Sequence, residues 1–494
     1  MKFKSIILKS ILALGVVLLS FSACDKKTQE KAIPESKLNT YSDLAVATST
    51  SAPCDCETDW FPHSQTPAPE EGIGSPFDTE NTTNCMFQQW SFQKFLWLTK
   101  TQRNGKPLFL NELKQVTNQM ETVTIPAGTS VALSSINQAG LDGVLQTIPG
   151  YSADGKTSDT VYYSIHVNAI LETAITKYVD SIKNGTLSRN NNATFPIGSL
   201  ETKVSWVPVT SLPSADIAKN DYYTTMAAVT QKDGSVVNEQ VALLGMHVVG
   251  VVINHPEFIW ATFEHNTLAP IFDFDSNTVS SDENTLIFEK GTASDVNGIR
   301  WKDGKPVAAN QAFGLFKYGV AVTGSGPNDY VKTSQSEPDN YHKIDSLNMC
   351  VSANLKSEND VWQNYQYDGA IWLNMDGLTT TQQADTIVKL YRHIKDATPG
   401  SMARGSLASA NVTMETYTQT YQTTHDKITD ASNLINCFSC HRGAPDTGSD
   451  TIRSPLYLSH VFSGNVSLIV DEQTPTEIEA NKLKAFMKVM SKSK

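Results

Sequence analysis

The sequence has few charged residues and no clustered basic segment. Asp, Glu, Lys and Arg make up only 18% of its 494 residues, and 51 acidic residues against 39 basic ones give a formal net charge of −12. Nucleic acids are bound through clustered Lys and Arg side chains that neutralise phosphates. We therefore expect no nucleic acid partner, whereas an acidic surface suits solubility or a basic protein partner.

Long apolar runs and the common catalytic motifs are also missing. Beyond the N-terminus, the longest apolar candidate is "VALLGMHVVGVVIN" (241–254), which is shorter than the roughly 18 residues that a membrane-spanning helix needs. The chain has no phosphate-binding glycine loop, nucleophile elbow or zinc-protease helix. The sequence therefore contains none of the most familiar signatures of nucleotide binding, serine hydrolysis or zinc proteolysis.

The N-terminus has the pattern of an export signal. Lysines precede an apolar run at 10–19, and small residues come directly before Cys24. This pattern resembles a bacterial lipoprotein cleavage site, with residues 1–23 removed and Cys24 lipidated, although Phe21 replaces the usual aliphatic residue. The alternative is an ordinary secretory peptide. We expect an exported protein, lipid-anchored on the periplasmic or cell-surface side of the outer membrane.

The remaining chain divides by composition. Residues 24–58 are polar and predict a flexible tether. Residues 59–400 mix helical and strand patterns and predict an α+β domain with an antiparallel sheet. Residues 401–494 predict a helical, cytochrome c-like haem-binding segment packed on that domain.

Seven cysteines are present, at 24, 54, 56, 85, 350, 437 and 440. If Cys24 is acylated and the last two bind a cofactor, four remain, which in an oxidising compartment is consistent with two disulfides. A bond between Cys54 and Cys56 would close a very tight ring, so each is expected to pair with Cys85 or Cys350. Buried thiols without disulfides are the alternative.

The stretch "CFSCH" (437–441) matches the attachment motif for c-type haem. On one helical turn, Cys437 and Cys440 share a face on which both sulfurs can add to the two vinyl groups, and His441 then points its imidazole at the iron. A zinc site would need a second Cys/His pair, and a thioredoxin-like redox pair would need a βαβ context. The motif therefore predicts one covalent haem c with His441 as proximal ligand.

The second axial ligand is left open by the sequence. Met487 follows the motif, but it lies in an amphipathic C-terminal helix, where a core role is the alternative. His460 could bind iron or be a hydrogen-bonded histidine near a turn. His247 and His265 are further candidates, and Arg442 could neutralise a haem propionate.

Three local patterns in the long front part predict elements. The helical segment 85–100 is apolar on most sides and predicts a buried helix. Residues 162–185 begin as a strand and continue as a helix that ends near Gly185. The alternating segment 201–209 predicts a strand.

The segment 243–266 predicts a hairpin buried on both faces. Two apolar runs flank a polar stretch, 254–257, which has turn chemistry. Counting back from that turn brings Met246 and His247 roughly opposite Glu264 and His265. Such a cluster could supply an axial ligand or metal ligands; an ordinary hydrogen-bonded core is the alternative.

Several of these stretches together resemble a family of largely uncharacterised exported bacterial proteins described as cytochrome c family proteins. The similar stretches are "WSFQKFLWLT" (90–99), "VYYSIHVN" (161–168), "FPIGSLETKVSWVPV" (195–209), "GMHVVGVVINHPEFIWATFEHN" (245–266), "DVWQNYQYDGAIW" (360–372) and "LASANVTMETYTQ" (407–419). The resemblance implies one large architecture that includes the haem motif. It implies haem-binding roles for Cys437, Cys440 and His441 only, and no substrate.

The sequence thus favours electron transfer by a single-haem, lipid-anchored cytochrome. Its partner would be a redox protein or a small-molecule electron donor or acceptor. The alternative is a haem-dependent redox enzyme, such as a peroxidase or oxygenase, with an open sixth iron position.

Overall fold

The computed structural model describes residues 54–492 with gaps, among them 135–145, 149–157, 217–220, much of 269–339, 390–402, 406–410 and 415–436. The expected signal peptide, Cys24, most of the tether and the expected boundary at residue 400 lie outside the described residues. Residues 52–494 form one compact unit. None of the described helices combines the length and the apolarity that crossing a membrane requires.

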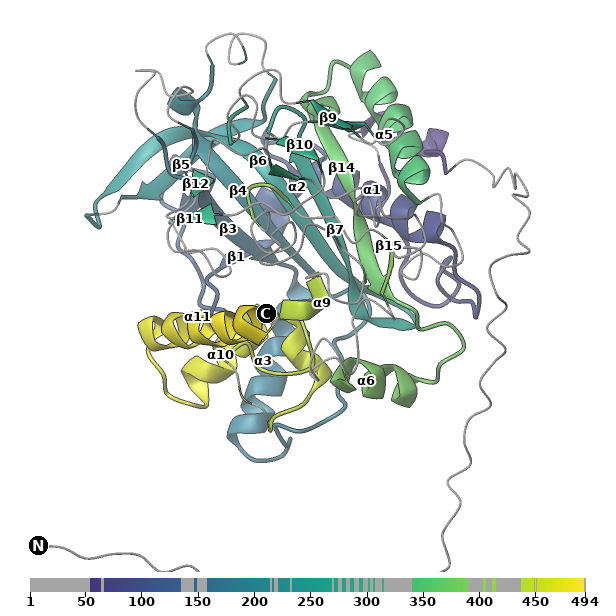
Figure 1. The fold of residues 1–494 in the computed structure, drawn as a ribbon, viewed down its shortest axis with the longest axis vertical. Coiled ribbons are helices and arrows are strands. Elements are labelled where there is room, and N and C mark those ends of the chain that lie inside the picture. Colours follow the sequence, from purple (N-terminus) through teal and green to yellow (C-terminus); the bar gives the residue numbers. More distant parts are fainter. Residues whose placement is uncertain are drawn as a thin grey trace, which may run out of the picture. The chain divides into compact units, whose positions relative to one another are not determined.

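A nine-stranded sheet forms the centre of the described residues (Figure 1). The path runs β1 (Lys114–Val116), β3 (Tyr162–Val167), β4 (Leu200–Pro208), β6 (Val236–Val252), β7 (His255–His265), β14 (Tyr365–Leu373) and β15 (Ala403–Gly405). Beside it, β5 (Thr224–Thr230) pairs with β6, and β2 (Val131–Leu133) pairs with β5. All pairings in this sheet are antiparallel except β2 with β5. The expected α+β class with an antiparallel sheet is confirmed.

Helices cover both faces of this sheet, each over its own apolar core. One face, here the α1 face, packs against α1 (Asn84–Thr99), α2 (Leu108–Glu112) and α5 (Asn340–Ser357). The other, the α10 face, packs against α3 (Ala169–Lys183), α6 (Thr380–Lys389), α9 (Cys437–Cys440) and α10 (His460–Ile469), with α11 (Pro475–Lys492) beside α10. Figure 1 shows the last three, in yellow, grouped with α3. Strands of this sheet are therefore buried on both sides.

Shorter elements complete the described residues. Three two-stranded pairs are β8 (Ile271–Asp273) with β9 (Thr278–Ser280), β10 (Ala293–Asp295) with β13 (Phe313–Gly314), and β11 (Trp301–Lys302) with β12 (Lys305–Pro306). The 3₁₀ helices are η2 (Thr58–Trp60), η4 (Val209–Ser211), η7 (Val361–Asn364) and η9 (Pro455–Leu458).

The helix and strand predictions are confirmed where local pattern decides them. Helix α1 begins after Thr83, whose hydroxyl accepts from the Met86 amide, and its aromatic residues are buried against the sheet. Strand β3 is followed by α3, which the side chain of Asn168 caps. Gly185 follows the helix end with a left-handed φ of 77°, a conformation that glycine adopts without strain.

The hairpin of β6 and β7 is confirmed, but its register differs from the expected one. Val252 pairs with His255, so the turn is Ile253-Asn254, with Asn254 at a φ of 64°. A bulge follows, and His247 lies opposite Thr262 instead of Glu264. The turn is shorter and earlier than its polar composition indicated, and the pairing is displaced by two residues. A displacement of two keeps every side chain on its expected face.

Two glycines of β6 allow close packing on opposite faces of the sheet. A Cβ on Gly250 would lie 2.7 Å from the Trp90 ring of α1, and one on Gly245 would lie 2.4 Å from the Asn411 amide nitrogen. Asn411 also donates to the Phe263 carbonyl at 3.0 Å. The segment 411–414 is thereby held against the α10 face.

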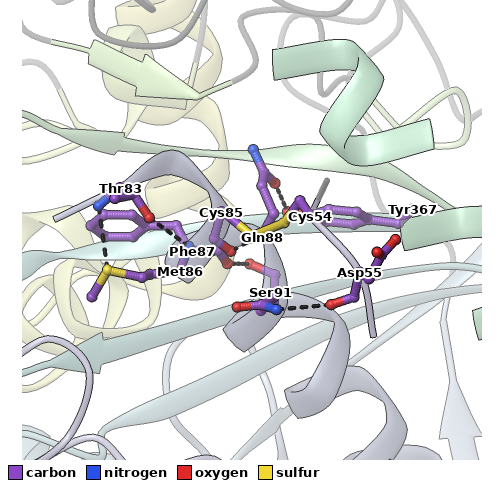
Figure 2. Close-up of a disulfide and its surroundings, with 10 residues drawn as sticks. Cys54, Asp55, Thr83, Cys85, Met86, Phe87, Gln88, Ser91 and Tyr367 are labelled. Carbon is purple, nitrogen blue, oxygen red and sulfur yellow. Dashed lines mark hydrogen bonds between the residues drawn. A yellow bond between two sulfur atoms is a disulfide. The ribbon is translucent and has the colours of Figure 1, made fainter. Parts of the chain in front are cut away.

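Two disulfides join the start of the compact unit to helices of the α1 face. Cys54 bonds to Cys85, and Cys56 bonds to Cys350. Figure 2 shows the first bond beside Gln88 and Tyr367, whose hydroxyl donates to the Gln88 side chain. The expectation that Cys54 and Cys56 each pair with Cys85 or Cys350 is confirmed.

Candidate functional site

The Cys437–Cys440 motif forms a single helical turn, α9, on the α10 face of the sheet. The backbone amide of His441 donates to the Cys437 carbonyl at 2.7 Å, which closes this turn. Both cysteines are half-buried, and neither forms a disulfide. The two cysteines therefore lie on one turn, immediately before the histidine.

The imidazole of His441 lies between two other rings. Its centroid is 4.0 Å from that of Trp260 on β7 and 3.9 Å from that of His460, with which it is nearly parallel at 19°. Its Nδ1 is 2.8 Å from the Leu458 carbonyl oxygen. A carbonyl can only accept, so Nδ1 carries the proton and Nε2 the lone pair, as an iron ligand requires.

Trp260 is itself held in place by the backbone of β7. Its indole Nε1 donates to the Glu257 carbonyl at 3.1 Å, three residues earlier in the same strand. Phe258, between them, has a φ of 69°, which is uncommon for a bulky residue and costs free energy. This bulged backbone turns the Glu257 carbonyl toward the indole and so orients the ring that contacts His441.

His460 supports His441 from the other side. It is the first residue of α10, after the N-cap Ser459, and its Nε2 lies 3.4 Å from the Cys440 carbonyl. Loss of hydration lowers the pKa of His460 to about 3, with further lowering by Lys482 and other cations nearby, so the ring is neutral at pH 7.

The stacked geometry bears on the possible axial role of His460. Two histidines on opposite faces of one iron have ligating nitrogens about 4 Å apart, with their rings directed away from each other. The rings of His441 and His460 instead lie face to face. To bind the iron opposite His441, the His460 ring would have to leave this stack.

Charged groups surround the two histidines. Ser459 Oγ donates to Glu201 of β4 at 3.3 Å, and desolvation raises the pKa of the Glu201 carboxyl to about 7 although Ser459, Lys203 and Lys482 act in the opposite direction. Lys482 of α11 forms ion pairs with Asp446 at 3.3 Å and Glu479 at 3.5 Å. Lys203, Lys482 and Arg442 all act electrostatically on His460, so three cations from separate segments lie around the motif.

His247 lies on the same sheet face as Trp260. On neighbouring cross-strand pairs, Val249 is opposite Trp260 and His247 is opposite Thr262. The His247 Nδ1 is 2.9 Å from the Thr262 hydroxyl. Diagonal neighbours of this kind have Cα atoms about 7–8 Å apart, so His247 is placed next to the ring that supports His441.

The structure does not bring His265, another sequence candidate, to this place. His265 is buried, its Nε2 lies 2.9 Å from the Asp221 carbonyl and its Nδ1 2.8 Å from the Thr267 hydroxyl. Desolvation lowers the pKa of His265 to about 4. The Met487 side chain, although its helix α11 is described, lies outside the described side chains.

Sequence reasoning did not identify Trp260, Glu201, Lys203 or the Leu458 carbonyl as neighbours of the motif. The period-two alternation of β7 could have placed Trp260 on the same face as Glu264. No local pattern could have shown that this face meets residues 437–460, which are about 200 positions later in the sequence.

The residues present fit a covalently attached haem. Two thiols on one turn, a histidine with its lone pair on Nε2, and nearby cations for the propionates match the donors and counter-charges that such a group needs. Among the described residues, no three His, Cys, Asp or Glu side chains gather as a separate metal site would require.

Comparisons with protein-family models, with curated proteins and with solved structures found no match for this chain.

Proposed function

We propose that the chain is an exported, lipid-anchored c-type cytochrome with one covalent haem, which transfers electrons between redox partners. The observation that supports this most directly is the fixed geometry of His441, held by the Leu458 carbonyl, Trp260 and His460 beside the two thiols of α9. Bound haem would supply an iron that accepts and releases one electron. The resemblance to exported cytochrome c family proteins points the same way.

In this proposal the described residues act as a scaffold. Cys437 and Cys440 would fix the porphyrin edge, and His441 would be the proximal ligand. Lys203 and Arg442 would neutralise the haem propionates, because a nearby cation offsets the hydration that a carboxylate loses when it is buried. Preventing rotation of the His441 ring keeps one nitrogen directed at the iron, so little rearrangement accompanies a change of its charge.

For the second axial position we favour His247. It lies on the α10 face next to Trp260, with its Nδ1 2.9 Å from the Thr262 hydroxyl. His460 would have to leave its stack to take this role.

The decisive measurement is the mass of the mature protein from a host that attaches c-type haem. We expect one haem more than the polypeptide plus lipid. C437A/C440A should lack this mass, and S439A, within the same turn, should retain it. If the unaltered chain carries no haem, the proposal is wrong.

Export and anchoring are tested separately, with the same full chain. The mature unaltered chain should carry the mass of the acyl lipid, and Cys24→Ser should lack it without a change in haem content. A mature chain without that lipid mass would contradict the lipid anchor but leave the haem proposal intact.

A haem-dependent redox enzyme is the second candidate, because the α10 face beside Trp260 presents polar side chains, among them His247, Thr262 and Glu264. Such groups could exchange protons with a bound substrate if the sixth iron position were open. Carbon monoxide or cyanide distinguishes the two functions. An absorption spectrum that does not respond favours electron transfer, and a rapid response favours the enzyme.

A further inference from the structure

Two carboxyl groups lie close together in the interior of the α10 face. Glu264 on β7 is 3% exposed and Asp368 on β14 is 6% exposed. Glu264 is paired with Gln366, and Gln366 Nε2 donates to Asp368 Oδ1 at 3.2 Å. Asp368 lies at a bulge of β14, between Tyr367 and Gly369, and its hydrogen bond with Gln366 places the two carboxyl groups on the same side of neighbouring strands.

The two groups differ in what compensates them. Glu264 Oε2 accepts a hydrogen bond from the Val412 amide at 2.9 Å. Asp368 Oδ2 is buried without a hydrogen-bond partner, and among the described residues no Lys or Arg forms an ion pair with Asp368. An ionised carboxylate in such a place would lose hydration that nothing in its surroundings replaces.

Electrostatics then favours one proton on the pair. Two buried carboxylates that face each other cannot both ionise cheaply, and one of them keeps its proton. Burial, followed by the charge of Glu264, raises the pKa of the Asp368 carboxyl well above its usual range, against the effect of the Gln366 hydrogen bond. The hydrogen bond from Val412 favours a negative charge on Glu264, whereas Asp368 Oδ2 has no such donor.

Other titratable groups on this face are Lys203 and Glu201 on β4, Tyr163 on β3 and His247 on β6; the segment 411–414, packed over the pair, contributes none. His441 and Arg442 follow on the side of α9. Asp368 lies next to the Gly369–Thr262 pair, and Trp260 follows two residues along β7. The carboxyl pair is therefore near the ring that contacts His441.

We propose that Asp368 and Glu264 form a proton-sharing pair, which takes up a proton from solvent when the iron of the proposed haem accepts an electron. The second half of this proposal rests on the proposed function; the first does not. An electron added nearby makes a further negative charge costlier, so the pair binds a proton more tightly in the reduced protein. One electron comes from the donor, and one proton comes from water.

The first measurement concerns the pair alone and does not need haem. In the infrared spectrum of the full chain at pH 7, we expect the C=O band of a buried protonated carboxyl. Glu201, whose pKa is about 7, also contributes to such a band, so the comparison is made in the Glu201→Gln chain. There Asp368→Asn should remove the band, and the control Asp233→Asn, the same change in an exposed turn, should leave it. Absence of the band in Glu201→Gln at pH 7 would overturn the proposal, whether or not haem is attached.

The second measurement is the midpoint potential of the holoprotein as a function of pH. Because the pair already holds its proton at pH 7, we expect the potential to fall only above the pKa of the pair in the oxidised protein, by up to about 59 mV per pH unit, the value for one proton per electron. Asp368→Asn should remove this slope, Glu264→Gln should move it to lower pH, and Asp233→Asn should retain it. A slope that persists in Asp368→Asn would overturn the coupling while leaving the shared proton to be decided by the infrared band.

Missing haem would be detected by mass before either experiment. In that case the proposed function and the coupling fail together, and the infrared band still decides whether the pair shares a proton. The two failures are thus distinguishable.

Discussion

The indole of Trp260 lies against the imidazole of His441, with ring centroids 4.0 Å apart, although 181 positions separate the two residues. This contact joins the central sheet to the CxxCH turn. The sheet therefore supplies one wall of the candidate site.

Replacing Trp260 should loosen His441. Trp→Ala in a core costs about 3–5 kcal/mol, and because Trp260 is only half-buried we expect about 2 kcal/mol in denaturant unfolding. Trp260→Phe keeps an aromatic face and should lose less. The absorption spectrum of Trp260→Ala holoprotein should broaden or shift, since the ring that orients His441 is gone, whereas the exposed-side control Ile73→Ala should match the original chain.

Replacing His460 tests whether it stacks or ligates. Phenylalanine retains a flat ring against His441 but cannot bind iron, so His460→Phe should keep the spectrum of the unaltered holoprotein. His460→Ala removes the stack and should destabilise the site. If the His460→Phe holoprotein instead shows the absorption spectrum of an iron with an open coordination position, His460 is the axial ligand and the stacking role is contradicted.

Acid should destabilise the fold through buried neutral histidines. The folded-state pKa of His265 is lowered to about 4 from the usual 6.5, chiefly by desolvation. Between these values the unfolded chain binds a proton that the folded chain does not, so stability falls as pH drops from about 6.5 to 4, by up to about 1.4 kcal/mol per pH unit. Urea unfolding of His265→Gln at several pH values should show a shallower dependence; an unchanged slope would show that other groups determine it.

The two disulfides should contribute unequally to stability. Cys54–Cys85 closes a separation of 31 residues and Cys56–Cys350 one of 294. Because a disulfide restricts the unfolded chain, we expect the shorter loop to add about 4 kcal/mol to the free energy of unfolding and the longer loop to add more. Paired Cys→Ser variants compared by denaturant unfolding measure the order. Peptide mapping without reduction checks the pairing, and a Cys54–Cys350 peptide would contradict it.

Asp368 should make the fold less stable at higher pH. Its folded-state pKa is raised, mainly by burial, so above the unfolded value of about 3.9 the folded chain binds the extra proton and stability declines as pH rises toward the folded-state pKa. Asp368→Asn resembles the protonated form and should unfold at higher denaturant concentration than the original chain at pH 8, with a smaller difference at pH 4. Equal midpoints at pH 8 would argue against a protonated Asp368.

Some features of this protein depend only on residues close together in the chain, and these could be predicted from the sequence. The spacing of Cys437, Cys440 and His441 defines the CxxCH motif. The local patterns of 85–100, 162–185 and 201–209 predict their elements because hydrophobic pattern and capping act within a few residues. The remaining features depended on the tertiary structure. Sheet order and bulges decide which distant residues meet. They bring together Cys56 with Cys350, the shifted β6–β7 pairs, Trp260 with His441 and His460, and Asp368 with Glu264. Local patterns specify which face a side chain takes, but only packing of the whole chain decides what lies opposite it.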